Sequence, residues 1–381
     1  MKKIIALIFT SMSLNVFGLL NDNSTVVIQS GLRNLNEISS HRSDLNSKEI
    51  EPAIRREVIL SLINELNNFY IFPETAELIE KDLLKRLKNN EYDALTDDIF
   101  VEKLNKDLLS ISKDKHLTVY YSARSIPVRE GKNEPTIEEN AKVSEYIKQI
   151  NFGFEKAECM EGNIGYIDLR GFYEPDAGAK TLAATMTFIS NTEALIIDLR
   201  NNEGGDPTMV ALITSYLFGD KPIHLNDLYW REENMTDEFW TKPQLAEIKY
   251  VNKDVYILTS SKTFSAAEEF CYNIKNLKRA TIIGETTGGG AHPGATVRLN
   301  EHFEAFLPKG RAINPITKTN WEGTGVEPDI KVPKEQALKI AYVLALTNSV
   351  EKIKDENVRQ TVKHLLKQLQ MELNEIEKFK T

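Results

Sequence analysis

Cysteine and histidine are both scarce in this sequence, with two cysteines and six histidines among 381 residues. Two cysteines are too few for a disulfide framework, although export would permit Cys159 and Cys271 to pair. Cys271 falls on an expected helix and is interpreted as a buried free thiol. The histidines and carboxylates lack the close ligand spacing of motifs such as HExxH, so the sequence predicts no metal centre and no other cofactor.

An excess of positive charge is also missing. The formal net charge is -9, whereas the counterion release that drives nucleic-acid binding requires clustered lysine and arginine. We therefore exclude a general nucleic-acid-binding function. Hydrophobic residues make up 41% of the chain, which is enough to bury a sizeable core in two or three domains.

The first residues combine charge and hydrophobicity as a targeting segment does. Lys2 and Lys3 precede an apolar run that starts at Ile4 and ends at small residues near Gly18. The run is short for a bilayer and is interrupted by hydroxyl residues, which favours a cleaved signal over an uncleaved anchor. We predict a signal peptide at residues 1–18, export to the periplasm or the extracellular space, and no stable membrane insertion after cleavage.

Hydrophobic periodicity divides the rest of the chain. Helical spacing of apolar residues dominates the first part, and short runs rich in Ile and Val then alternate with helical segments. Such alternation is typical of parallel strands that are buried on both faces, so the fold class is α/β. The predicted organisation is a polar tail at 19–47, a helical N-terminal domain at 48–122, a connector at 123–161, an α/β core at 162–334 and a C-terminal helical tail at 335–381.

Glycine clusters follow several of the predicted strands, at the carboxyl ends where open α/β sheets place their sites. In the segment IIDLRNNEGGDP, Gly204 and Gly205 precede a helix that is expected to begin at Pro207. Their backbone N–H groups could face a bound anion or a developing oxyanion. The alternative is an ordinary tight loop in which Asp198 and Arg200 pair with each other.

A serine stands at the start of another predicted helix, in the segment VYILTSSKTFSAAEEF. A helix amino terminus stabilises negative charge, and the small residue Ala266 allows a substrate to approach Ser265 closely. Ser265 is therefore a candidate nucleophile. The alternative is that Ser265 only caps the helix, with Glu268 completing a capping box, and the two roles are compatible.

A serine nucleophile needs a base, and a third group usually fixes that base. Two histidines remain as candidates after those in polar or featureless segments are set aside. His116 lies at a predicted helix–strand junction in SKDKHLTVYY, and His292 follows a glycine cluster in GETTGGGAHPG. A surface position is the alternative for His116, and Glu322, in the turn of NWEGTGVEPDI, would ordinarily be solvated.

Six segments, in the same order, resemble those of one serine peptidase family: SKDKHL, GYIDLRGF, IIDLRNNEGG, TSSKTFSAAEEF, GETTGGGAHPG and NWEGTGVEPDI. The family contains carboxyl-terminal processing (tail-specific) proteases and tricorn core protease. The resemblance runs from about residue 50 to 335 and is closer to the branch similar to interphotoreceptor retinoid-binding protein. It implies a crotonase-like α/β core and matches Ser265 to the family nucleophile.

The resemblance also implies the roles of the remaining site residues. The processing proteases use a lysine base, but GGGAHPG contains no lysine, and this departure resembles the tricorn-like arrangement. That arrangement implies His116 as the base and Glu322 as the residue that supports the site. His292 stays open as the alternative base, because it is nearer in sequence to the position where the relatives carry lysine.

An oxyanion hole is implied as well, formed by the backbone N–H of Gly204 or Gly205 with that of Ala266. The stretch between the helical domain and the core is too short for the PDZ domain that many processing proteases insert, so no PDZ domain is expected. The predicted function is an exported serine peptidase that cleaves peptide or protein substrates through an acyl-enzyme on Ser265. A non-catalytic hydrophobic-ligand-binding protein and a serine esterase are the alternatives, and the oligomeric state stays open.

Overall fold

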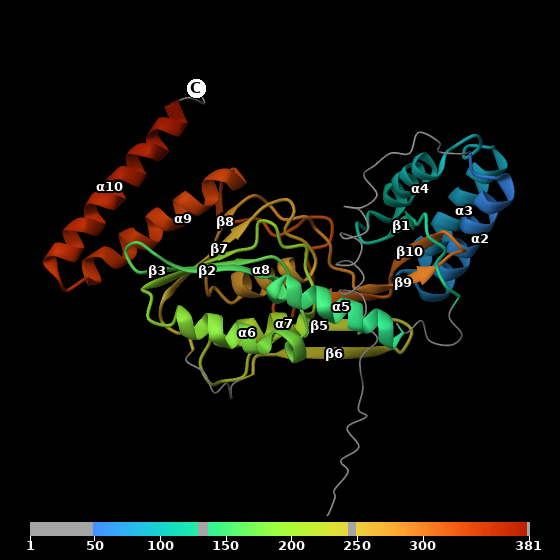
Figure 1. Ribbon diagram of the computed structural model, residues 1–381. Helices are drawn as coiled ribbons and strands as arrows, with labels where there is room; N and C mark the ends of the chain where they lie inside the picture. The colour runs from blue at the N-terminus through green and yellow to red at the C-terminus, as the bar shows by residue number, and fades with distance from the viewer. Residues whose placement is uncertain (1–48, 129–135, 243–248, 379–381) are drawn as a thin grey trace, which may run out of the picture.

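The structure is a computed structural model and describes residues 49–128, 136–242 and 249–378 (Figure 1). The predicted signal peptide and polar tail lie outside these residues. The helices are α2 (Pro52–Phe69), α3 (Pro73–Lys88), α4 (Asp97–Ser112), α5 (Ile137–Gln149), α6 (Pro175–Phe188), α7 (Pro207–Tyr216), α8 (Ala266–Asn276), α9 (Lys334–Ser349) and α10 (Glu356–Lys378). The strands are β1 (Thr118–Tyr121), β2 (Phe154–Met160), β3 (Ile164–Leu169), β4 (Ala194–Asp198), β5 (His224–Trp230), β6 (Met235–Trp240), β7 (Asp254–Thr259), β8 (Thr281–Gly284), β9 (Gly294–Arg298), β10 (Phe303–Pro308), β11 (Gly310–Ile313) and β12 (Ile330–Lys331).

A six-stranded sheet forms the centre of the molecule, with the strand order β12-β8-β7-β4-β3-β2. All neighbouring strands in it run parallel except β2, which pairs with β3 in the antiparallel sense. The four central strands follow one another through helices, as parallel strands require. The prediction of a mixed α/β fold with a helical N-terminal region is confirmed.

Alternate residues of each central strand face opposite layers of helices. On β4, Leu195 and Ile197 pack with α6, α7 and α8, whereas Ala194 and Ile196 pack with α9. Because both faces are covered, every residue of β4 is buried. Figure 1 shows α10 lying against α9 at the outer side of that second layer. This sandwich holds the carboxyl ends of the strands in a fixed frame.

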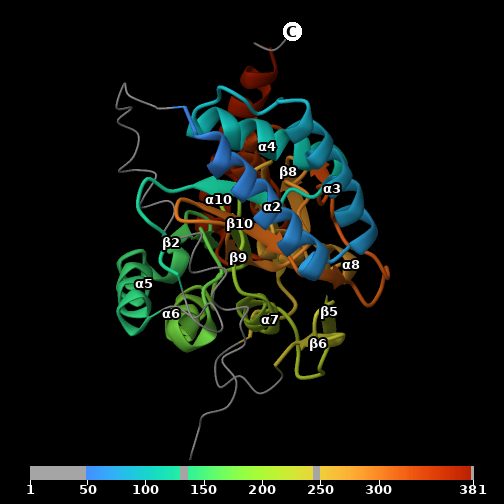
Figure 2. The same cartoon turned by 90° about the vertical axis from the view of Figure 1, so that its right-hand side faces the viewer.

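Helices α2, α3 and α4 form a second hydrophobic core beside the sheet. The proline at the start of α2 and of α3 suits the first turn of a helix, where its missing N–H costs nothing. This core is completed by a three-stranded sheet, β1-β10-β9, whose last two strands come from residues 294–308. Figures 1 and 2 show β9 and β10 beside α2, far along the chain from it.

The stretch 123–161 differs from the plain connector that the sequence predicted. It contains α5 and β2, and β2 extends the central sheet at its edge. The strand was missed because only Phe154 of its seven residues is buried, so no apolar run marks it. Both thiols are free, and Cys271 is buried on α8 as predicted. Among the described residues, none of the helices combines the length and the apolar character needed to cross a membrane.

Candidate active site

Ser265 lies at the amino end of α8, after a loop that leaves β7. We call residues 259–265 the nucleophile loop. Two hydroxyl groups fasten it to the end of β4: Ser260 Oγ donates to Arg200 O at 2.5 Å, and Thr263 Oγ1 donates to Leu199 O at 2.7 Å. Ser265 itself has φ 53° and ψ -122°, a backbone conformation that is strained for a residue with a side chain. Such strain is typical of functional sites.

Glu268 connects this loop to the glycine cluster at 288–290. Its Oε2 accepts hydrogen bonds from Ser265 N at 3.0 Å and Gly290 N at 2.8 Å, and its Oε1 accepts from Gly289 N at 2.6 Å and from Thr287 Oγ1. The predicted capping contact from Glu268 to the Ser265 backbone is therefore confirmed. Burial raises the pKa of Glu268 to about 7, although all four hydrogen bonds act to lower it. One carboxylate thus fixes both backbone segments of the site.

Gly204 approaches the nucleophile from the end of β4. A Cβ atom at Gly204 would lie 2.8 Å from Ser265 Cβ and 3.0 Å from Ala266 N, and its φ of +115° also requires glycine. Two of the three residues predicted for the oxyanion hole, Gly204 and Ala266, therefore lie beside Ser265, and Gly205 follows Gly204 in the chain. Gly204 N already donates to the side chain of Asn202 at 2.9 Å, so Gly205 N–H is the better partner for Ala266 N–H.

The ring of His116 lies against Phe264, the residue before the nucleophile, with 4.6 Å between the ring centroids. A Cβ atom at Gly290 would lie 2.7 Å from His116 Cε1, so the imidazole also contacts the glycine cluster. Burial lowers the pKa of His116 to about 4, opposed by Asp114 and assisted by His292. The imidazole is therefore neutral at pH 7 and able to accept a proton.

Three further side chains gather next to His116, and we call this group, Asp114, His292 and Glu322, the acidic junction. His292 Nδ1 lies 2.8 Å from Asp114 Oδ2 and 3.4 Å from Glu322 Oε2. The three come from separate loops. Their donor atoms all lie within 4.8 Å of one another, so the same side chains could also hold a metal ion.

The junction also binds backbone on two sides. Asp114 Oδ1 accepts from His116 N at 3.0 Å, and Asp114 Oδ2 accepts from Tyr70 Oη at 3.1 Å. Glu322 Oε2 accepts from Ala291 N at 2.5 Å. Burial raises the pKa of Glu322, and Asp114 adds to that effect. Glu322 is therefore half-buried in this network and not a solvated turn residue.

The structure thus places Gly204 beside Ser265 and Ala266, and His116 beside Phe264, whereas His292 and Glu322 lie in the acidic junction. Asp198 and Arg200 form the structural pair that was the alternative for their segment, with 2.6 Å between Asp198 Oδ2 and Arg200 Nη2. Helix α7 begins at Pro207, as predicted. Asp114 was missed, and its only sequence signal was its position two residues before a candidate histidine.

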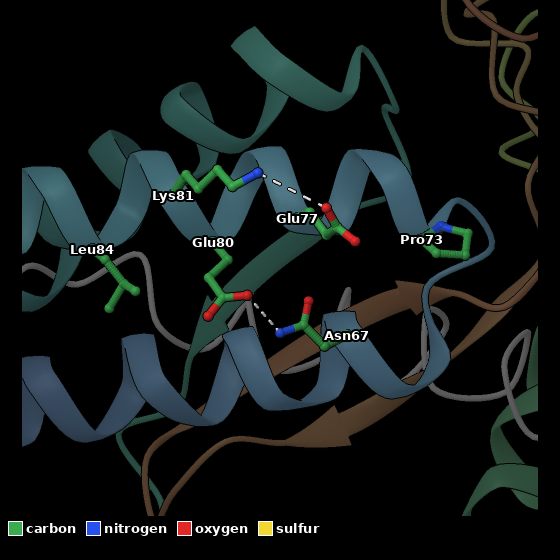
Figure 3. Close-up of a pocket in the computed structure, with 6 residues that line it drawn as sticks. All are labelled: Asn67, Pro73, Glu77, Glu80, Lys81 and Leu84. Carbon is green, nitrogen blue, oxygen red and sulfur yellow. Dashed lines mark hydrogen bonds and ion pairs between the residues drawn. The ribbon is translucent and has the colours of Figure 1, made fainter.

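A groove of about 510 Å³ lies elsewhere, on the outer side of α2 and α3 (Figure 3). Asn67 Nδ2 donates to Glu80 Oε2 at 2.9 Å across it, and Lys81 pairs with Glu77 at 3.9 Å. Its lining includes none of the site residues described above, so it is unrelated to the nucleophile.

Two family models match this chain. The model of peptidase family S41 matches residues 163–332, and the model of the N-terminal domain of Peptidase_S41 in eukaryotic IRBP matches residues 52–155. The matched ranges include Ser265 and Glu322 in the first and His116 in the second. The described fold, including the helical region, is therefore matched over most of its length.

Curated relatives point to the same family. A probable CtpA-like serine protease of Staphylococcus epidermidis is 26% identical over 215 residues, covering 55% of this chain and 41% of the relative. The chloroplastic carboxyl-terminal-processing peptidase 2 of Arabidopsis thaliana is 26% identical over 172 residues, covering 45% of this chain and 32% of the relative. This chain thus spans less than half the length of these relatives.

Solved structures share the fold at low sequence identity. A putative peptidase from Parabacteroides merdae has a TM-score of 0.52 at 17% identity, covering 77% of this chain and 96% of that one. A lipoprotein from Streptococcus agalactiae has a TM-score of 0.50 at 15% identity, covering 80% of this chain and 100% of that one. These likenesses concern the fold alone. The two family models together match residues 52–155 and 163–332, so the chain belongs to peptidase family S41.

Proposed function

We propose that this chain is a serine peptidase that hydrolyses peptide bonds through an acyl-enzyme on Ser265. The observation that carries the proposal is the convergence at the amino end of α8. There a strained serine meets the Gly204 backbone on one side, and a half-buried neutral imidazole packs against the preceding residue on the other. A nucleophile, a base and backbone donors at one helix terminus are the parts that acyl transfer requires.

In the proposed mechanism, Ser265 Oγ attacks the carbonyl carbon of the scissile peptide bond while His116 takes the hydroxyl proton. The carbonyl oxygen becomes an oxyanion, which the N–H groups of Gly205 and Ala266 stabilise with help from the α8 dipole. His116 then returns the proton to the leaving amine, leaving an acyl-enzyme on Ser265. A water molecule, deprotonated by His116, hydrolyses that ester and restores the free serine.

We favour His116 over His292 as the base because of the contacts each ring makes. His116 lies against Phe264 and Gly290, and the Gly290 and Ser265 amides share one oxygen of Glu268. His292 instead faces the acidic junction. Glu322 supports the site from the side of that junction, where it holds the backbone at Ala291.

Several finer features belong to the same proposal. We infer a crotonase-like core at 162–334 without a PDZ domain, preceded by a helical domain at 48–122 and followed by a helical tail at 335–381. The arrangement of helices on both faces of a parallel sheet supports this division. Export, after removal of a signal peptide at 1–18, places the substrate, a peptide or protein, in the periplasm or outside the cell. Mass measurement of the secreted mature chain tests the cleavage.

A serine-directed fluorophosphonate probe tests the reaction. Wild-type protein is expected to be labelled, and Ser265→Ala is expected to lose labelling and on the order of 10⁶ in kcat. Ser261→Ala, an exposed serine of the same loop, is the matched control and retains labelling. An unlabelled wild-type protein would instead support the non-catalytic ligand-binding alternative. Comparison of peptide and ester substrates distinguishes a peptidase from an esterase.

A further inference from the structure

The second imidazole near the site, His292, is more deeply buried than His116 and has different surroundings. The residue is only 5% exposed, and its ring packs edge to face with that of Phe72, with 5.1 Å between ring centroids. Phe72 and Tyr70 belong to the turn between α2 and α3. His292 therefore sits where the glycine cluster of the core touches the helical region.

Asp114 is the partner that links this imidazole to the catalytic one. Its side chain is buried, and its two oxygens bind different groups. Oδ1 accepts from the His116 backbone N–H, while Oδ2 accepts from His292 Nδ1 and from the Tyr70 hydroxyl. A carboxylate buried this deeply needs such partners to stay ionised. The loop that carries His116 is thus tied to the core through His292.

We propose that His292 is a positioning residue and that the His292–Asp114 pair holds the loop of His116 in its catalytic orientation. His292 acts through Asp114 on the His116 backbone, and Glu322 secures its other side by binding the Ala291 backbone. The pair also joins the helical region to the core. The role of His116 as base rests on the proposed function, whereas the pair itself does not.

The charges around the pair agree with this assignment. Burial alone would raise the pKa of Asp114, but the hydrogen bond from His292 and the charges of His292 and His116 outweigh burial and lower it. Tyr70, whose pKa burial raises, faces the pair from the helical region as a neutral donor. Glu322 faces it from the turn after Trp321. Ionised Asp114 is therefore the expected state at neutral pH.

Substitution of His292 separates positioning from proton transfer. Asparagine places an N–H donor near the position of Nδ1 but cannot act as a base, whereas leucine fills the space without a donor. The rate of fluorophosphonate labelling is expected to fall less than about tenfold in His292→Asn and about 10²-fold in His292→Leu, the usual cost of a misplaced catalytic group. His302→Asn, a partly exposed histidine, is the matched control and should label at the wild-type rate.

The dependence of labelling on pH gives a readout that a merely structural role would not move. Because His292 lowers the pKa of His116, its replacement by asparagine should shift the acid limb to higher pH. Two results would overturn the proposal: a His292→Asn protein as inactive as Ser265→Ala, which would make His292 the base, or a His292→Leu protein with wild-type labelling. Circular dichroism identifies any variant that fails to fold.

A second measurement judges the pair without catalysis. In full-length Ser265→Ala protein with ¹⁵N-labelled histidine, the His292 Nδ1 proton is expected to give a slowly exchanging NMR signal. That signal should disappear in the additional variant Asp114→Asn if Asp114 is its acceptor. Persistence of the signal would refute the pair. If wild-type protein is not labelled by the probe, the proposed peptidase function fails while this measurement still decides on the pair.

Discussion

The nucleophile loop and the acidic junction solve the same problem of holding a reactive side chain still, but they do it with different parts of the chain. Around Ser265, the key bond joins residues three positions apart, and Glu268 makes it within one helical turn. Around His292, the key bond joins residues 178 positions apart. A local cap forms with its helix, whereas the junction exists only after the helical region and the core have docked. The two should therefore respond differently to substitution.

Among the substitutions that compare the two regions, the largest effect is expected at Gly290, where the nucleophile loop and the ring of His116 meet. A Cβ atom there would lie 2.2 Å from Phe264 Cζ and 2.7 Å from His116 Cε1, distances that force one ring to move. We expect Gly290→Ala to lower peptidase or labelling rates by at least about 10²-fold, since a misplaced catalytic group costs this much. Gly219→Ala, where a Cβ meets nothing within 4 Å, is the control. Equal rates in the two variants would mean that the position of the His116 ring does not matter for the reaction.

Glu268 sharpens the comparison on the side of the nucleophile loop. In Glu268→Gln the amide group would face backbone N–H donors that now bind a carboxylate, and the loss of unfolding free energy should be about 2–4 kcal/mol. Glu139 caps α5 with the same geometry but is only half-buried, and its carboxylate accepts from Thr136 N at the surface. Urea denaturation of Glu139→Gln should show a loss of about 1 kcal/mol or less. Similar losses of unfolding free energy in Glu268→Gln and Glu139→Gln would contradict the claim that burial makes the Glu268 contacts the more important ones.

The pH dependence of labelling and of stability tests the environment of His116, next to the acidic junction. Burial holds the pKa of His116 at about 4, below its ordinary value of 6.5, so the neutral base should persist to low pH and the acid limb of labelling should lie near pH 4. The folded protein favours neutral imidazole, so this group stabilises the fold above pH 6.5. That contribution, on the order of 3 kcal/mol, is lost as the pH falls from 6.5 toward 4.

Labelling and denaturation measured between pH 3.5 and 8 check both statements. His116→Gln serves as the control for denaturation, because it cannot titrate in this range. An acid limb near pH 6.5 would indicate that the base is exposed or is another residue.

The smallest effect is expected at Lys115, which crosses from the loop of His116 to the glycine cluster at the surface. Its Nζ donates to Gly288 O, but the side chain is exposed. Because exposed charged contacts contribute at most about 1 kcal/mol, Lys115→Gln should change the labelling rate less than about fivefold. A greater loss would mean that the surface contact, and not the buried pair, fixes the loop.

Local features of this fold followed from the sequence, and long-range ones did not. The start of α7 at Pro207 and the Glu268 contact to the backbone of Ser265 were predictable because each depends on neighbours within one turn. The pairing of His292 with Asp114 was not, since no periodicity or spacing links two loops so far apart. Resemblance to a family placed Ser265, His116 and Glu322, and their catalytic roles stay predictions.

Strands β9 and β10 have a consequence for how the protein is made. Residues 297–307 supply part of the hydrophobic core under α2, α3 and α4, although those helices are synthesised some two hundred residues earlier. A nascent chain that has emerged only as far as the end of β1 therefore exposes the apolar side of its helices. The helical region can complete its hydrophobic core only after β9 and β10 have been synthesised. Protection by a chaperone during translation would therefore benefit this region most.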